Sequence, residues 1–173
     1  MNILKLELTH FGKFHLKTIT FTSGLNIVYG KNEAGKSTIH AFVRSMLFGI
    51  PDTEEGNERY SHYLPWETPH DFCGRMWIKK DDKVYRIERN FLRPQPTVRV
   101  FDDETDESLQ PAKQHLRQIL SGLTETSYLN TICIEQLKSA TDPQLAKELE
   151  DMAVNASQSK NLNIDVKQAK QEL

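Results

Sequence analysis

The sequence has 173 residues, which is enough for one sizeable hydrophobic core. Hydrophobic residues make up 38% and charged residues 27% of the chain, and no apolar run approaches the roughly 18 residues of a membrane-spanning helix, which argues against a membrane protein. The net charge of −2 excludes a uniformly basic nucleic-acid coat. Residues 1–50 nevertheless hold six Lys or Arg against two acidic residues, so the first third can bind an anion.

Cysteine, histidine and N-terminal patterns restrict the cellular setting. The two cysteines lie sixty residues apart without a CxxC pair, and the six histidines show no metal-binding spacing. The N-terminus alternates apolar and polar residues and lacks the apolar stretch of a signal peptide. We therefore expect a cytoplasmic protein with no membrane partner and no histidine-based metal site.

The first third of the chain predicts three strands and a helix. Residues 3–11 alternate with period two, and residues 16–21 follow after a turn as a second strand. Residues 25–29 form an apolar run that predicts a short buried strand. From Lys36 onward the apolar residues recur at helical spacing, up to a stop at Gly49, and form one face: Ile39, Phe42, Val43, Met46 and Leu47.

The middle of the chain predicts a loop and antiparallel strands. Residues 51–71 are polar, acidic and rich in turn-forming residues, which indicates a surface loop. Residues 73–92 form two alternating runs hinged at Asp81–Asp82, as in a hairpin. Residues 96–108 predict another strand with an acidic turn.

The last part of the chain is less regular. Residues 110–123 predict a helix with one face formed by Ala112, His115, Leu116, Ile119 and Leu120. Residues 128–137 form a short apolar segment, which we interpret as a strand that ends in a polar glutamine. After Pro143 the chain has no aromatic residue and reads as an interrupted helix with little apolar surface to bury.

The segment "GKNEAGKS" fits the pattern GxxxxGK[ST] of a phosphate-binding loop. Gly30 and Gly35 allow close backbone approach, so that N–H groups can surround a phosphate. Lys36 offers an ammonium to the β- and γ-phosphates, and Ser37 offers a hydroxyl to Mg²⁺. A chain of this length would match the pattern by chance about once in a hundred. A nucleoside triphosphate with Mg²⁺ is the ligand that the motif predicts.

The rest of the loop is expected to contribute mainly backbone N–H groups, and Asn32 is also a candidate for orienting the attacking water. The helix that follows adds the positive end of its dipole. The predicted nucleotide-binding residues of the loop are therefore Gly30, Lys31, Asn32, Glu33, Ala34, Gly35, Lys36, Ser37 and Thr38.

A phosphate-binding loop alone does not select one enzyme class. Four segments together are more specific: "LTHFGKF", "LNIVYGKNEAGKSTIHAFVRSMLFG", "GRMWI…VYRIERNF" and "CIEQL". They resemble the N-terminal part of ABC-type ATPases of the SMC and SbcC group, and the form "G.NEAGKST" is especially similar to the YhaN-like members.

This resemblance implies an α/β P-loop NTPase fold. In the resembled group the ATPase head consists of two lobes, and a long coiled coil separates them in the sequence. Residues 1–140 would be the N-terminal lobe, with an antiparallel β layer from residues 72–102 added to the P-loop sheet. Residues 141–173 would be the helical foot of the coiled-coil arm. Walker B and signature motifs are not found, so the chain looks truncated, and alone it is expected to bind ATP weakly and hydrolyse it poorly.

The resemblance also assigns roles to single residues. Lys36 would be catalytic. Gln136 stands where the group has its Q-loop glutamine, and would touch Mg²⁺ or the lytic water; a surface glutamine is the alternative. Lys13 lies where the group often has a basic residue near the nucleotide, although a solvated turn lysine is an equal alternative.

The implied partners are a second copy of the head, a metallophosphoesterase-type nuclease and DNA. A DNA-contacting surface is suggested by basic residues in and near the hairpin: Arg75, Lys79, Lys80, Lys83, Arg86, Arg89, Arg93 and Arg99. A solvated hairpin is the alternative for them. Two other functions stay open at this point: a different P-loop enzyme such as a small-molecule kinase, and a regulatory module that binds nucleotide without turnover.

Overall fold

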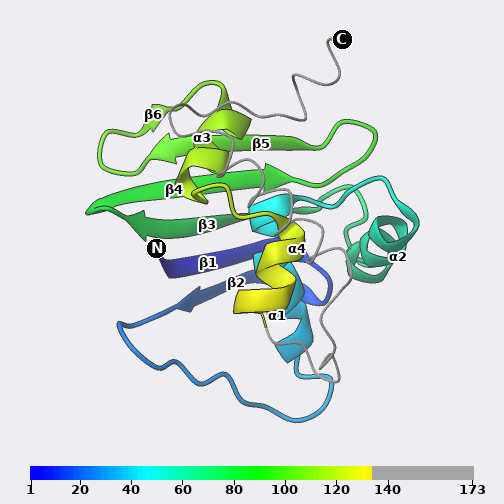
Figure 1. The fold of residues 1–173 in the computed structure, drawn as a ribbon. Coiled ribbons are helices and arrows are strands. Elements are labelled where there is room, and N and C mark those ends of the chain that lie inside the picture. The colour runs from blue at the N-terminus through cyan, green and yellow to red at the C-terminus, as the bar shows by residue number, and fades with distance from the viewer. Residues whose placement is uncertain (134–173) are drawn as a thin grey trace. The chain divides into compact units, whose positions relative to one another are not determined.

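The computed structural model describes residues 1–133 and divides the chain into two compact units, Met1–Gly122 and Leu123–Leu173. The first unit contains a six-stranded sheet with the order β2-β1-β3-β4-β5-β6, which Figure 1 shows face on. Its strands are β1 Asn2–Phe11, β2 Phe14–Thr20, β3 Cys73–Lys80, β4 Lys83–Asn90, β5 Thr97–Asp102 and β6 Glu107–Ser108. Its helices are α1 Lys36–Phe48, α2 Glu54–Tyr63 and α3 Ala112–Ile119.

The sheet confirms the predicted antiparallel hairpin and changes its place in the fold. Asp81 and Asp82 both have positive φ values, 48° and 65°, as a tight two-residue turn requires. β1 pairs with β2 on one side and with β3 on the other. The hairpin therefore continues the sheet of the first two strands instead of forming an added layer, and every strand pair among residues 1–133 is antiparallel.

One face of the sheet carries the core. Leu6, Met76, Ile87 and Val100 stand opposite one another across four strands, and all are fully buried. The predicted apolar side of α1 packs on this face, with Phe42, Met46 and Leu47 buried. Burial of such a row is the main favourable term in folding, at about 25 cal/mol per Å² of apolar surface.

A glycine allows α1 to approach the sheet closely. A Cβ atom on Gly74 would lie 2.4 Å from the ring of Phe42 and 2.8 Å from the carbonyl oxygen of Glu7. Side chains do not tolerate such distances, so Gly74 fixes how deeply Phe42 inserts.

An arginine holds the other end of α1. The guanidinium of Arg89, on β4, donates hydrogen bonds to the carbonyl oxygens of Met46 (2.7 Å) and Leu47 (3.2 Å). Arg59 of α2 donates to the carbonyl oxygen of Gly49 (3.2 Å). Burial lowers the pKa of Arg89 to about 10, which still leaves it charged at neutral pH. A cation at a helix C-terminus satisfies free carbonyl groups and the negative end of the dipole.

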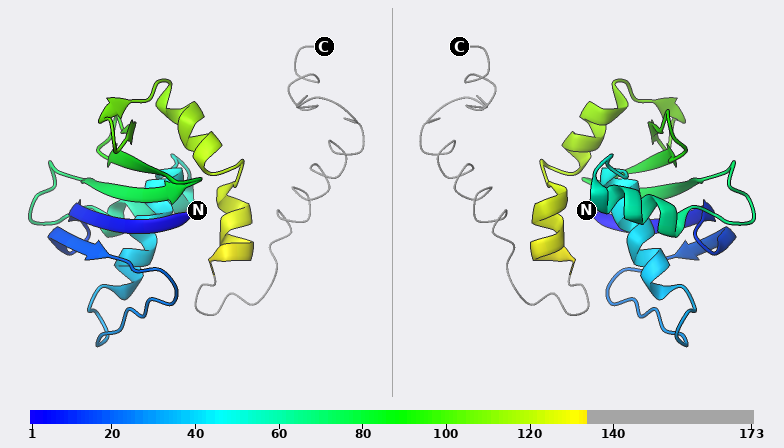
Figure 2. Two further views of the ribbon diagram at one scale, coloured as in Figure 1. Left: turned by 90° about the vertical axis from the view of Figure 1, so that its left-hand side faces the viewer. Right: turned by 90° about the vertical axis from the view of Figure 1, so that its right-hand side faces the viewer.

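Residues 54–63 form a helix where a loop was expected. Thr53 caps α2 by accepting a hydrogen bond from the N–H of Gly56 (3.2 Å), and Glu54 and Glu55 occupy the first turn. The right-hand view of Figure 2 shows α2 beside α1, and Arg44 forms an ion pair with Glu55 at 2.8 Å. The polar composition hid this helix, although a threonine followed by two glutamates is a known helix-start signal.

An aromatic cluster joins α2 to the sheet. Phe11 at the end of β1 lies 5.1–5.6 Å, between ring centroids, from four other rings: Phe42, Tyr63, Phe72 and Phe91. Aromatic pairs at these separations add to the stability from area burial. The cluster thus brings the end of α2 next to the turn between β1 and β2.

The prediction of a buried strand over residues 25–29 is wrong for this structure. The segment has no regular secondary structure, and it belongs to the long open connection between β2 and α1 in Figure 1. Leu25, Ile27 and Tyr29 are 87%, 75% and 90% exposed. An apolar run becomes a strand only where a neighbouring strand accepts its hydrogen bonds, and residues 1–133 supply none here.

The second unit is described only up to Cys133. Thr124 caps a short helix, α4 Glu125–Ser127, by accepting a hydrogen bond from the N–H of Ser127 (3.0 Å), and the π-helix Tyr128–Ile132 follows. The strand expected at the start of the segment 128–137 is therefore helical over residues 128–132. Gln136 and the proposed arm 141–173 lie outside the described residues. Within residues 1–133, no helix is long and apolar enough to cross a membrane.

Replacement of Arg89 by methionine should lower the free energy of unfolding by about 2 kcal/mol, because it leaves two carbonyl groups at the end of α1 without their donor. Since the guanidinium stays charged below its pKa of about 10, the loss should be equal at pH 6 and pH 8. Urea denaturation measures it. Arg99→Met is the matched control: Arg99 is itself 63% exposed, and its partner Glu88 keeps Arg75 and Arg86, so a change within about 0.5 kcal/mol is expected. Equal losses in both variants would contradict this role of Arg89.

Candidate functional site: the phosphate-binding loop

The predicted loop leads directly into α1. Gly35 is the N-cap of the helix, with a left-handed φ of 99°, and its carbonyl oxygen accepts the first helical hydrogen bond from Ile39 (3.0 Å). Before it, the N–H of Ala34 donates to the carbonyl oxygen of Lys31 (3.1 Å), which closes a tight turn. The loop thus curls over the positive end of the α1 dipole.

Each of the two motif glycines is required for a different structural reason. A Cβ atom on Gly35 would lie 2.4 Å from the ring of Phe14, the first residue of β2. A Cβ atom on Gly30 would lie 2.9 Å from the Cβ atom of Ala34, so the two ends of the loop nearly touch. Larger residues would force the loop open.

Lys36 folds back over the loop. Its ammonium donates hydrogen bonds to the carbonyl oxygens of Gly30 and Lys31, each at 2.8 Å. Ser37 is exposed at the second position of α1, and Thr38 after it is half-buried. The structure therefore brings an ammonium, a hydroxyl and the N-terminus of a helix to one exposed place.

Lys13 reaches the loop from the turn between β1 and β2. Its ammonium donates a hydrogen bond to the carbonyl oxygen of Glu33. Gly12 beside it donates from its N–H to the carbonyl oxygen of Tyr63 (2.7 Å), and a Cβ atom on Gly12 would lie 2.9 Å from Thr38. The location expected for Lys13 agrees with this geometry, and its contact with a nucleotide stays a prediction.

The residues present fit a triphosphate with Mg²⁺. The two glycines form a cradle that side chains would fill, and two lysine ammonium groups and the start of a helix surround it. Ser37 supplies the oxygen ligand that Mg²⁺ prefers. Within residues 1–133, no group of three or more His, Cys, Asp or Glu residues could hold a metal by itself. A cation here would consequently depend on phosphate oxygens as well as on Ser37.

Comparisons with known proteins give the family. Residues 1–153 match the AAA domain family. The chain belongs to this family. It is 43% identical over 56 residues, 32% of the chain, to the uncharacterized protein YhaN of Bacillus subtilis. It is 26% identical over 146 residues, 79% of the chain, to the DNA double-strand break repair Rad50 ATPase of Thermococcus kodakarensis.

These matches confirm the resemblance to the N-terminal region of SMC/SbcC-like ATPases and the P-loop NTPase class of this AAA domain. The matched parts make up only 6% of the Bacillus protein and 15% of the Thermococcus protein. The activity and partners of a whole protein of this family are therefore matters for proposal.

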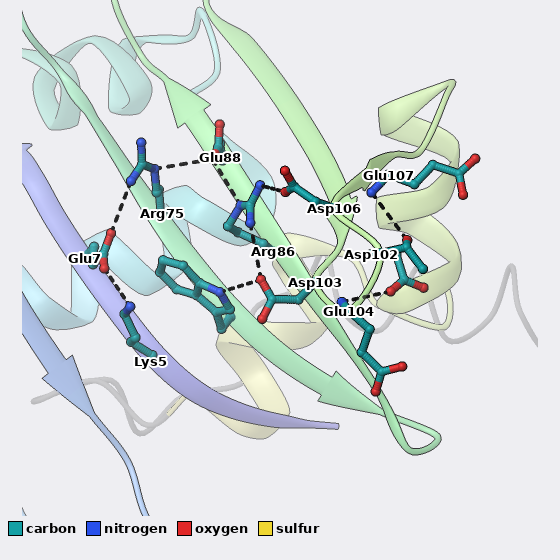
Figure 3. Close-up of polar contacts among 12 residues, drawn as sticks. Lys5, Glu7, Arg75, Arg86, Glu88, Asp102, Asp103, Glu104, Asp106 and Glu107 are labelled. Atoms are coloured by element: carbon teal, nitrogen blue, oxygen red, sulfur yellow. Dashed lines mark hydrogen bonds and ion pairs between the residues drawn. The ribbon is translucent and has the colours of Figure 1, made fainter.

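The basic residues of the hairpin do not form one free cationic surface. Alternation places Arg89 on the core face, where it binds α1, and places Arg75, Arg86 and Arg99 on the opposite face. Glu88 lies between them, with ion pairs to Arg75 (3.3 Å), Arg86 (3.2 Å) and Arg99 (2.9 Å). Figure 3 shows that these ion pairs belong to one network, which extends from Lys5 and Glu7 to the acidic residues after β5.

The remaining lysines and Arg93 are also partnered. Lys79 and Lys83 form ion pairs with Asp82 (3.3 Å) and Asp102 (3.8 Å). Lys80 donates hydrogen bonds to the carbonyl oxygen of Gln118 and the hydroxyl of Ser121, and Arg93 pairs with Asp52 (3.4 Å). A phosphate backbone would have to compete with these carboxylates, but most of the basic side chains that pair with them are exposed and their ion pairs are individually weak, so a DNA-contacting hairpin stays a prediction.

Gly35→Ala should destabilise the protein more than Gly24→Ala. Both glycines have left-handed backbones, with φ of 99° and 90°, but a Cβ atom meets the Phe14 ring only at Gly35. Gly24→Ala should therefore lose about 1 kcal/mol from backbone strain alone, and Gly35→Ala about 1–3 kcal/mol more. Thermal unfolding of both variants measures this. In the Gly35→Ala background, Phe14→Ala should relieve part of the loss; strictly additive losses would contradict the contact.

Proposed function

We propose that the chain binds ATP with Mg²⁺ through Gly30–Thr38 and is the nucleotide-binding N-terminal part of an ATPase. The observation that carries the proposal is the ammonium of Lys36, held within 2.8 Å of two carbonyl oxygens of a loop whose glycines cannot carry side chains. A cation positioned over a glycine cradle at a helix N-terminus is suited to a triphosphate.

Each residue has a separate task in this proposal. Lys36 exchanges its carbonyl partners for β- and γ-phosphate oxygens and stabilises the charge that develops on the transferred phosphoryl group. Backbone N–H groups of Lys31 and Asn32 hold the phosphates in line, and Asn32 orients the attacking water. Ser37 ligates Mg²⁺, which neutralises phosphate charge when bound. Lys13 adds a second cation on the side of the β1–β2 turn.

We propose further that residues 1–140 are one lobe of a head whose remaining motifs lie in another lobe, joined through an arm that begins with residues 141–173. The exposed apolar side chains of residues 25–29 support this, because a lobe that shares its sheet with another lobe leaves such a strand uncovered when alone. The small share of each relative that the chain matches is compatible with this arrangement.

The whole protein would act in the cytoplasm on DNA, as a pair of heads with a metallophosphoesterase-type nuclease. The support is the likeness to a Rad50 ATPase, whose name states DNA double-strand break repair. Gln136 would contact Mg²⁺ or the lytic water and transmit the state of the γ-phosphate to the arm. Arg75, Arg86 and Arg99 of the hairpin region already pair with Glu88, so DNA that binds there would have to displace this carboxylate.

Lys36→Met in the full-length protein should reduce ATP turnover by about 100-fold or more, because the methionine cannot stabilise phosphate charge. Phosphate release measures turnover. Lys17→Met, at an exposed position of β2, is the matched control and should stay near the starting activity. Near-normal turnover in Lys36→Met would contradict the assignment. ATP binding without turnover in the unmodified protein would instead favour a regulatory module.

Gln136→Ala in the full-length protein should leave ATP affinity within a few-fold, because the loop contacts dominate binding. Turnover and ATP-dependent pairing of heads should both fall at least tenfold. Equilibrium binding and light scattering with a non-hydrolysable analogue measure the two effects. A variant that pairs and turns over normally would show that the sensor role is misassigned.

A further inference from the structure

Two histidines face each other across the β1–β2 hairpin, and the contacts of the phosphate-binding loop use neither of them. The strand register pairs His10 directly with His15. Their rings lie edge to face with centroids 4.5 Å apart, and their Nδ1 atoms are separated by 3.2 Å. The two strands thus bring two imidazole nitrogens together at one place.

A hydroxyl group completes the cluster. Oγ1 of Thr68, in the segment after α2, lies 2.9 Å from Nδ1 of His10. This nitrogen therefore has two polar neighbours at hydrogen-bond distance, although an imidazole nitrogen carries only one proton or one lone pair. Hydrogen bonding among the three groups consequently leaves one contact poorly satisfied. A cation among them would accept a lone pair from each.

The separation of the two nitrogens suits a shared metal ion. Zinc binds histidine nitrogen at about 2.0–2.1 Å, so two nitrogens on one tetrahedral ion lie about 3.3 Å apart. The observed 3.2 Å differs little from this value. Mg²⁺ and Ca²⁺ prefer oxygen ligands, whereas neutral imidazole suits Zn²⁺, Cu²⁺ and Ni²⁺. The nitrogens of the cluster therefore favour the second group of ions.

The backbone around both histidines departs from regular strand geometry. β1 shifts its register against β3 between Glu7 and His10, and Leu16, next to His15, has a left-handed φ of 49°. Register irregularities re-aim side chains, and a bulky residue in the left-handed region is strained. Because such features are frequent at functional sites, the irregular backbone is independent support for a site at this end of the hairpin.

From this geometry we infer that His10 and His15 bind a transition-metal ion of the Zn²⁺ class through their Nδ1 atoms, with the hydroxyl of Thr68 as a weaker third ligand. His15 is exposed and His10 is half-buried, so the ion can enter from solvent. Within residues 1–133 no third His, Cys, Asp or Glu joins the group, and water would fill the remaining positions. The inference is independent of the proposed ATP site, because it uses no residue of that loop.

The metal would hold the turn that carries Lys13. His10 and His15 bracket residues 11–14, so the ion would join β1 to β2 at the base of this turn and tie both to the segment after α2 through Thr68. The sequence led us to expect no histidine-based metal site. A spacing of five residues gave no signal, because the two histidines become neighbours only through the register of the hairpin.

The experiment titrates Zn²⁺ into the 173-residue chain at neutral pH without nucleotide. Calorimetry measures binding, thermal unfolding measures stabilisation, and NMR of the imidazole nitrogens locates the ion. Zn²⁺ should raise the melting temperature and shift the Nδ1 resonances of His10 and His15, while those of the other histidines stay in place. Mg²⁺ at the same concentration should leave both histidines unchanged, because it prefers oxygen ligands.

Single substitutions then test each ligand. His10→Gln and His15→Gln should each weaken Zn²⁺ binding about tenfold or more, and Thr68→Val should weaken it less than either. His70→Gln is the matched control, because His70 is exposed two residues after Thr68 and is not part of the cluster. Cys73→Ser tests the thiol, because Cys73 is the β3 partner of His10. Both of these variants should bind Zn²⁺ as the unmodified chain does.

The inference is wrong if Zn²⁺ does not bind, if His15→Gln binds it as tightly as the unmodified chain, or if only Cys73→Ser or His70→Gln abolishes binding. His10→Gln also loses the contact with Thr68, and if it does not fold, His15→Gln and the nitrogen resonances decide, because His15 is exposed. None of these results bears on the phosphate-binding loop, which ATP turnover tests separately.

Discussion

The close contact between Phe42 and Gly74 determines where α1 lies, and the site depends on α1. With a side chain at position 74, the ring of Phe42 could not reach the buried row of the sheet, and the helix would shift outward. Arg89 and Arg59 fix the far end of the same helix through its terminal carbonyl groups. A rigid helix held at its middle and its C-terminus presents a defined N-terminus, where the phosphate-binding loop begins.

Charge is distributed unequally over the two sides of this unit. On the open face of the sheet, rows of alternating sign run across the strands, and Glu88 alone pairs with three arginines. At the loop, by contrast, the partners of Lys13 and Lys36 within residues 1–133 are carbonyl oxygens, which carry no net charge. A basic composition is therefore a weak indication of an anion site. Two ammonium groups that no carboxylate of the described residues pairs with are a stronger indication.

The sequence allowed the phosphate-binding loop, α1 and the β3–β4 hairpin to be predicted, because each depends on local chemistry: glycine spacing, helical periodicity and a two-residue turn. It did not allow α2 or the state of residues 25–29 to be predicted. Polar composition concealed α2, whose half-buried Tyr60 and Tyr63 pack against phenylalanines that are distant in the sequence. The apolar run 25–29 has strand chemistry, but strand pairing is a property of two segments. The contact of Phe14 with Gly35 was missed because it too joins two segments that are distant in the sequence.

The loop is supported unequally on its two sides. Its C-terminal side continues into α1 and contacts Phe14 and Lys13, and the β1–β2 turn that carries Lys13 is bonded through Gly12 to Tyr63 at the end of α2. Its N-terminal side continues into an apolar segment without a strand partner in residues 1–133. When a ligand orders the free end of a loop that is fixed at its other end, the loop loses conformational entropy, and this loss weakens binding. A surface that pairs with residues 25–29 would order this end of the loop before the ligand binds, and so would reduce the entropy lost on binding. Assembly of the head would in this way be coupled to its affinity for phosphate.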